Sequence, residues 1–317
     1  MYENKKVLLI AGGGTLGTYT AEELLRLGCT VDVICLEENV SWHERLRYIQ
    51  AKVDKAFLED FLPGKGYDGI VNFIHYPDVE EYKQVHPILA ANTGHLIFLS
   101  SYRIYADEQH PITESAPKLL DVSTDEKFLA EEDYALSKAK AERYLREESG
   151  THNWTAVRPV ISFSQRRFDL ICRSGRDIIE AAKKGEVLEL MADSRNLTAG
   201  LDWAGNSGKL IANLLFKEGT FGESYTISSG QNLTWGQVAQ CYEELLGAKF
   251  AWIDTQTYME KHMHPSAIWL LLYDRLFDRY IDNSKVLKAT GLENYRFPSI
   301  KEGIQIELDK IGEEYRK

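Results

Sequence analysis

A glycine-rich turn near the N-terminus constrains this chain more than any other feature. Gly12, Gly14 and Gly17 follow the apolar run Val7-Leu8-Leu9-Ile10 and precede a helix-period stretch that begins near Thr18. In the pattern G-x-G-x-x-G, the first glycine permits a tight turn, the second lets the backbone approach a pyrophosphate, and the third allows close helix packing. The helix N-terminus then faces the phosphates, so we expect a bound dinucleotide. The residues expected to contact it are Gly12, Gly14, Thr15, Leu16 and Gly17.

Apolar runs alternate with helix-period stretches through the first half of the chain. The strand-like runs are rich in β-branched residues and show no polar alternation, which is typical of parallel strands covered by helices on both faces. We therefore predict an α/β fold with a doubly wound parallel sheet of the Rossmann type. The expected strands are residues 7–10, 31–36, 69–74 and 96–99, and the first expected helix is 20–27.

The sheet is expected to continue past residue 150. A long helix is predicted over about 131–148, and Trp154-Thr155-Ala156-Val157-Arg158 then resumes strand character until Pro159 stops it. Beyond it, short strands such as 224–227 and amphipathic helices such as 234–246 suit a smaller lobe. We predict a dinucleotide-binding domain over 1–160, to which some later segments return, and a mainly substrate-binding C-terminal lobe over 161–317.

Composition excludes several classes of protein. The 317 residues carry a formal charge of -11, with 44% hydrophobic and 27% charged residues, so we expect a globular protein with no nucleic-acid partner. The four cysteines lack C-x-x-C spacing, so no metal and no disulfide framework is predicted. The longest apolar run, 267–273, is too short to span a membrane and is interpreted as a buried or interface helix. No export signal stands at the N-terminus, so a cytoplasmic location is expected.

The segment after the second predicted strand bears on the choice of cofactor. An acid that binds the adenosine ribose is expected about 20 residues after the glycine turn. Cys35 occupies the expected strand-end position, and Glu37 is the nearest carboxylate beyond it. The same segment has no Arg or Lys that could hold a 2′-phosphate, so NAD is favoured over NADP. A solvated loop is the alternative interpretation of Glu37 and Glu38.

Two further motifs carry reactive groups. Tyr134 and Lys138 are four residues apart at the start of the long helix, so they share a face and the ammonium can favour the phenolate. The buried run 96–99 ends in Ser100 and Ser101, at the sheet edge where open α/β folds bind ligands. The glycine turn, the serines and the Tyr-Lys pair predict one site.

With these motifs the chain resembles the extended short-chain dehydrogenase/reductases, the NAD-dependent epimerase/dehydratase family. The resemblance covers nearly the whole chain, and residues 67–74 are similar to a divergent branch of the family that includes RNA-binding relatives. It implies that Tyr134 is the general acid/base and also contacts the cofactor, that Lys138 binds the nicotinamide ribose and lowers the pKa of Tyr134, and that Ser101 orients the reacting oxygen. The matching segments are 11–17, 100–105, 134–142 and 157–159, and more weakly 195–202 and 282–285.

The chain also departs from the family pattern. Tyr102-Arg103 follows Ser101 where the 4,6-dehydratases carry Asp-Glu, which argues against sugar dehydration. The family's Y-G-P becomes Phe163-Ser164-Gln165, followed by Arg166-Arg167. Arg166 and Arg195 are the candidate substrate-binding residues, with a solvated charged loop as the alternative for the Arg166-Arg167 pair.

These observations predict an NAD-dependent epimerase that acts on a secondary alcohol of a sugar or nucleotide-sugar through a keto intermediate. An NAD-dependent sugar dehydrogenase or reductase would need the same Ser, Tyr and Lys, so that alternative stays open. A non-catalytic Rossmann protein that binds RNA or regulates a partner is the alternative from another class. A homodimer is compatible with each of these hypotheses.

Overall fold

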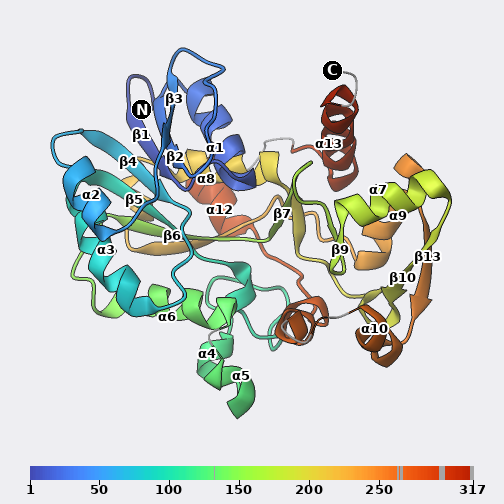
Figure 1. Ribbon diagram of the computed structural model, residues 1–317. Coiled ribbons are helices and arrows are strands. Elements are labelled where there is room, and N and C mark those ends of the chain that lie inside the picture. The colour runs from blue at the N-terminus through green and yellow to red at the C-terminus, as the bar shows by residue number, and fades with distance from the viewer. Residues whose placement is uncertain (132, 263, 265–266, 293–296, 315–317) are drawn as a thin grey trace.

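A seven-stranded, fully parallel sheet forms the centre of the larger part of the molecule (Figure 1). The structure, a computed structural model, describes residues 1–131, 133–262, 264, 267–292 and 297–314. The strand order is β12-β6-β5-β4-β1-β2-β3, in which the order reverses beside β1. The strands of this sheet are β1 (Lys6–Ile10), β2 (Thr30–Cys35), β3 (Leu46–Gln50), β4 (Tyr67–Asn72), β5 (Thr93–Leu99), β6 (Trp154–Pro159) and β12 (Glu223–Ile227).

Helices cover both faces of the sheet. Val7 and Leu9 of β1 point to one face and pack with residues of α1, α8 and α12, whereas Leu8 and Ile10 point to the other and pack with α2, α3 and α6. Both sets are fully buried, which is why β1 shows no polar alternation. The predicted doubly wound α/β fold is therefore confirmed. The helices are α1 (Thr15–Arg26), α2 (Lys55–Phe61), α3 (Val79–Ala91), α6 (Tyr134–Glu147), α8 (Ala204–Leu214) and α12 (Ser284–Thr290).

The expected elements of the first half are present with small shifts. The first helix begins at Thr15 rather than near Thr18, directly after Gly14. The edge strand β3 and the helices α2 and α3 were not predicted from the sequence. β3 is only partly buried along its length, because it has a neighbour on one side only, so its sequence lacks an apolar run.

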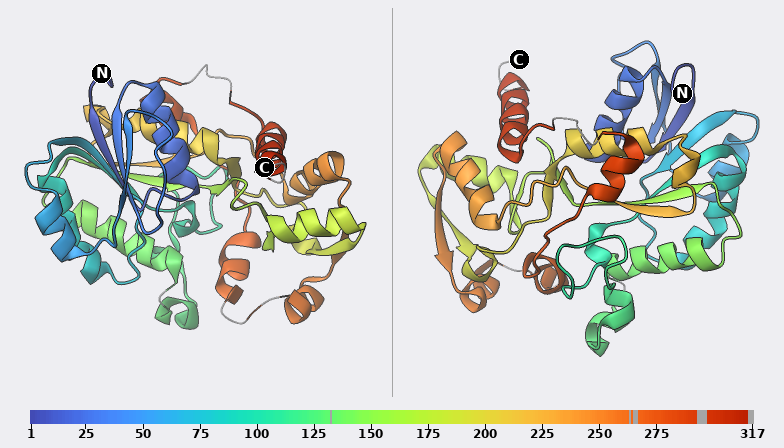
Figure 2. Two further views of the ribbon diagram at one scale, coloured as in Figure 1. Left: turned by 45° about the horizontal axis from the view of Figure 1, so that its top comes forward. Right: turned by 180° about the vertical axis from the view of Figure 1, so that it is seen from behind.

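A smaller α/β lobe lies beside the carboxyl edge of the sheet (Figures 1 and 2). Its strands are β10 (Val187–Met191) and β13 (Lys249–Ile253), which pair in parallel, and β8 (Asp169–Leu170) and β9 (Arg173–Ser174), which pair antiparallel. β7 (Ile161–Phe163) pairs with β11 (Leu201–Trp203) between the two parts. The helices are α7 (Gly175–Lys184), α9 (Trp235–Leu246), α10 (Thr255–His262), α11 (Ile268–Leu270) and α13 (Ile300–Glu314), and α4 (Leu119–Val122) and α5 (Glu126–Ala130) project from the sheet side.

Three segments after residue 160 return to the sheet. α8 crosses α1 so closely that a Cβ added at Gly208 would lie 2.6 Å from the backbone carbon of Tyr19. β12 extends the sheet beside β6, and α12 packs near it. On the sheet side, Asp125 caps α5, because its carboxylate accepts hydrogen bonds from the backbone N–H groups of Lys127 and Phe128.

No helix in the described part of the chain is long and apolar enough to cross a membrane. The described residues also contain no cluster of three or more His, Cys, Asp or Glu side chains placed to hold a metal ion. Of the apolar run 267–273, Leu271 is fully buried, whereas the residues of α11 are only partly buried.

Candidate active site

The glycine-rich turn has the close packing that its sequence predicts. A Cβ added at Gly17 would lie 2.2 Å from the Gly12 carbonyl oxygen, and one added at Gly12 would lie 2.7 Å from the Leu9 Cβ. Neither position can hold a side chain without moving the backbone. Gly14, by contrast, has nothing within 4 Å of its Cβ position. Its open side is where a ligand could approach the backbone.

Two cavities flank this turn. One, of about 450 Å³, contains the reactive side chains; the other, of about 540 Å³, lies over the ends of β1 and β2. Ala11 and Gly14 line both. The N-terminus of α1 therefore separates two hollows, as required for a dinucleotide whose pyrophosphate rests on the turn and whose halves extend to either side.

The second cavity contains the predicted ribose acid, Lys52, which the sequence pattern did not indicate, and Arg166, which was expected to bind the substrate. Glu37 lines it, and its carboxylate lies 3.6 Å from the Cβ position of Gly13. Glu38 does not line it. Lys52 and Arg166 also line this cavity. The segment after β2 therefore has no Arg or Lys, but the cavity contains one of each. Both residues are brought there from other parts of the chain.

Ser101 and Tyr134 lie together in the first cavity. Ser101 follows β5 and caps the short 3-10 turn 102–104, where its hydroxyl accepts a hydrogen bond of 3.2 Å from the Arg103 backbone N–H. Tyr134 is the first residue of α6, which is held in place by Asp133, whose carboxylate accepts a hydrogen bond of 2.7 Å from the Ala135 backbone N–H. The sheet edge and a capped helix thus bring the two hydroxyls together.

Two arginines lie within electrostatic range of the Tyr134 phenol. Burial raises the pKa of Tyr134, and Arg103, Arg167 and a hydrogen bond from Ser101 act in the opposite direction. Lys138 is not among the groups that lower it. The role of Lys138 toward the phenolate stays a prediction, and the two guanidinium groups are further cations that the sequence pattern did not indicate.

Lys138 is buried under the site and held by backbone oxygens. Its ammonium donates hydrogen bonds to the carbonyls of Leu99, at 2.5 Å, and Ile74, at 3.4 Å, and lies 5.6 Å from the Tyr134 ring centre. Burial lowers the pKa of Lys138 to about 7, against the opposing effect of Glu142. An ammonium has three N–H donors, so these two hydrogen bonds leave one donor.

His75 lies against the other side of the tyrosine. Its ring centre is 4.7 Å from that of Tyr134, and its Nε2 is 2.8 Å from the Ser137 hydroxyl. Burial lowers the pKa of His75 to about 4, so the imidazole is neutral near pH 7. No catalytic role follows from these contacts.

The two arginines proposed as substrate ligands lie in different places. Arg166 donates a hydrogen bond of 2.6 Å to the Gly13 carbonyl, so it lies over the glycine turn. Arg195 lies outside both cavities, with its guanidinium 5.2 Å from the Trp252 ring centre in the smaller lobe. The structure does not bring Arg195 together with the other predicted residues.

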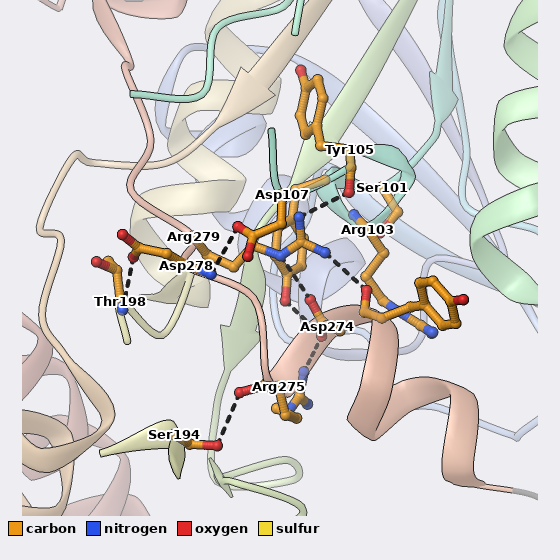
Figure 3. Close-up of polar contacts among 12 residues, drawn as sticks. Ser101, Arg103, Tyr105, Asp107, Ser194, Thr198, Asp274, Arg275, Asp278 and Arg279 are labelled. Carbon is orange, nitrogen blue, oxygen red and sulfur yellow. Dashed lines mark hydrogen bonds and ion pairs between the residues drawn. The ribbon is translucent and has the colours of Figure 1, made fainter. Parts of the chain in front are cut away.

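A buried charge network closes the far side of the first cavity (Figure 3). Asp274 accepts hydrogen bonds from Arg275, from Arg279 at 3.2 Å and from the Tyr102 hydroxyl at 2.8 Å. Arg275 also binds Asp169 at 2.6 Å. No local sequence pattern indicates this network, because Tyr102 and Asp274 are 172 positions apart.

The chain is similar to known proteins in structure but not in sequence. No protein-family model and no curated protein matches the sequence. Among solved structures, the epimerase Mth375 of Methanothermobacter thermautotrophicus matches with a TM-score of 0.74 at 14% identity, covering 99% of this chain and 94% of that one. The UDP-glucose 4-epimerase of Thermotoga maritima matches with a TM-score of 0.69 at 15% identity, covering 98% and 99%. The chain has the fold of these epimerases.

A third similar structure is the UDP-glucuronic acid 4-epimerase of Bacillus cereus in complex with UDP-glucuronic acid and NAD. Its TM-score is 0.69 at 14% identity, with 97% of this chain and 99% of that one covered. At such identities the likeness establishes the architecture expected from the resemblance to the extended short-chain dehydrogenase/reductases. The chemistry must be argued from the site itself.

Proposed function

We propose that this protein is an NAD-dependent epimerase of the extended short-chain dehydrogenase/reductase family that inverts a secondary alcohol of a sugar or nucleotide-sugar. The observation that carries the proposal is the meeting of Ser101 and Tyr134 in one cavity with the N-terminal turn of α1. Solved structures of the same fold, two of them nucleotide-sugar 4-epimerases by name, support it.

Ser101 and Tyr134 have different roles in the proposed reaction. Ser101 donates a hydrogen bond to the reacting oxygen and fixes its position next to Tyr134. The Tyr134 phenolate removes the hydroxyl proton and later returns it to the same oxygen. NAD, when bound, supplies reversible hydride acceptance at the carbinol carbon. Inversion would require the ketone to rotate in the cavity so that it receives hydride on its opposite face, which would give the inverted alcohol with no net oxidation.

The remaining residues would hold the dinucleotide. The backbone N–H groups at Gly14, Thr15 and Leu16 face its pyrophosphate, and the free N–H of Lys138 binds the nicotinamide ribose. Glu37 accepts hydrogen bonds from the adenosine ribose. Arg166, anchored on the Gly13 carbonyl, lies beside the phosphates, which assigns it to the cofactor rather than to the sugar.

The experiment that tests this function follows cofactor and product together. Purified protein is incubated with UDP-glucose, UDP-glucuronic acid and the corresponding free sugars, and NADH absorbance and product stereochemistry are measured. We expect an inverted product without net NADH. Stoichiometric NADH release with a ketone product would make the protein a dehydrogenase, whereas no NAD binding at all would favour a non-catalytic Rossmann protein.

Binding of NAD is expected to be about tenfold tighter than binding of NADP, or about 1.4 kcal/mol, because the Glu37 carboxylate repels a 2′-phosphate on the same ribose. Isothermal titration calorimetry with both dinucleotides measures this difference. Glu37→Gln should reduce it, whereas Glu38→Gln, one residue outside the cavity, should leave it unchanged. Tighter binding of NADP by the unmodified protein would show that Lys52 and Arg166 determine the preference instead.

A further inference from the structure

The first cavity has more positive charge than its own acids neutralise. Arg103, Arg167 and Arg275 line it, and Asp274 is the one carboxylate among the described lining residues. Asp274 is fully buried and already binds Arg275, Arg279 and the Tyr102 hydroxyl. With Asp169 it balances Arg275 and Arg279. Nothing in that network is left to neutralise the other two lining arginines.

Arg103 is incompletely paired. Its guanidinium lies 3.5 Å from Asp133, a long contact for an ion pair, and 5.5 Å from the centre of the Tyr134 ring. Its Nε is buried and has no hydrogen-bond partner. A buried guanidinium N–H without an acceptor is unfavourable unless a ligand supplies one. Figure 3 shows the side chain extending from beside Ser101 toward the segment that carries Asp274.

Arg167 adds a second cation at the same site. It lines the cavity at an exposed position, and its guanidinium forms no ion pair or side-chain hydrogen bond with the described residues. Arg103 and Arg167 both lower the pKa of the Tyr134 phenol. Their charges therefore lie within electrostatic range of the oxygen that accepts the substrate proton.

We propose that Arg103, together with Arg167, binds an acidic group carried on the reacting sugar ring, so that the substrate is an acidic sugar rather than a neutral one. The inference rests on the proposed function for the position of the reacting alcohol, next to Ser101 and Tyr134. The forked guanidinium matches the two oxygens of a carboxylate or phosphate. An anion that reaches Arg103 while a hydroxyl contacts Tyr134 must be attached close to the reacting carbon.

The test measures binding, which does not depend on turnover. Equilibrium affinities are determined by calorimetry on the NAD-supplemented protein for UDP-glucuronic acid, UDP-glucose, UDP, glucuronic acid, glucose 6-phosphate and glucose. We expect at least one acidic sugar to bind about 10- to 100-fold more tightly than its neutral counterpart, as for a charge-assisted hydrogen-bonded pair. The two acidic substituents distinguish a carboxylate from a phosphate.

Substitutions then connect that preference to Arg103. Arg103→Gln should abolish it, and Arg103→Lys should retain part of it, because the charge remains while the fork is lost. Arg176→Gln removes an exposed arginine that pairs with Glu180 on α7 and should change nothing. Circular dichroism establishes that each variant is folded.

Equal affinity for acidic and neutral sugars, or a preference that survives in folded Arg103→Gln, would overturn the proposal. If Arg103→Gln weakened the binding of UDP by itself as much as the binding of the acidic nucleotide-sugar, the proposal would also be overturned, since the arginine would then bind the diphosphate. An acidic sugar that binds through Arg103 without being converted would leave the subsite standing and refute the epimerase function. Epimerisation of a neutral sugar, with no preference for acidic sugars, would support the epimerase function and refute the acidic subsite.

Discussion

Tyr134→Phe is expected to lower turnover by about 10²-fold or more, because it removes the oxygen that we propose takes and returns the substrate proton, while keeping the ring. The ring contacts with His75 and with the Arg103 guanidinium do not require the hydroxyl. The fold and the affinity for NAD should therefore persist. Steady-state rates, thermal unfolding and NAD titration on the same preparation measure the three quantities.

Tyr280→Phe is the matched control for this substitution. Tyr280 is 48% exposed and does not line either cavity, so loss of its hydroxyl should leave turnover unchanged. Near-normal turnover in folded Tyr134→Phe would remove Tyr134 from the mechanism. A loss of NAD binding in that variant would indicate a role in the cofactor site instead.

Glu142→Leu is expected to lower the free energy of unfolding by about 3–5 kcal/mol, the range for breaking a buried ion pair. The Glu142 carboxylate binds the Arg158 guanidinium through two hydrogen bonds, at 2.8 and 2.5 Å, and both side chains are 1% exposed. Burial by itself would raise the pKa of Glu142, but Arg158 lowers it to about 2. Removing the acid leaves a guanidinium without its counter-ion inside the protein. Urea denaturation measures the change.

Two comparison variants separate charge from packing. The double substitution Glu142→Leu with Arg158→Met should recover much of the lost stability, because no unpaired charge remains. Glu147→Leu, at an exposed position on the same helix, should change the free energy of unfolding by less than about 0.5 kcal/mol. A change below about 1 kcal/mol in Glu142→Leu would contradict the importance of this pair. Because Glu142 raises the pKa of Lys138, Glu142→Leu should also lower the pKa of Lys138.

The sequence by itself determined the features that depend on short-range geometry. The glycine spacing follows from one turn and the first turn of one helix, and the collisions at Gly12 and Gly17 explain why no other residue fits. Tyr134 and Lys138 share a helix face because they are four residues apart. Ser101 follows a strand whose apolar run ends at the sheet edge. These features depend on neighbouring residues and do not depend on contacts with distant parts of the chain.

Only the tertiary structure decided which charges meet around those groups. Arg103 and Arg167 lower the pKa of the Tyr134 phenol, and the Lys138 ammonium donates hydrogen bonds to backbone carbonyls. Arg195, which matches the family pattern by position, lies against Trp252 outside the cavity. Such outcomes depend on contacts between segments far apart in the chain, and the free energy of a buried charge depends on every neighbour that packing supplies. A local pattern of residues therefore does not predict which distant residues will surround a buried charge.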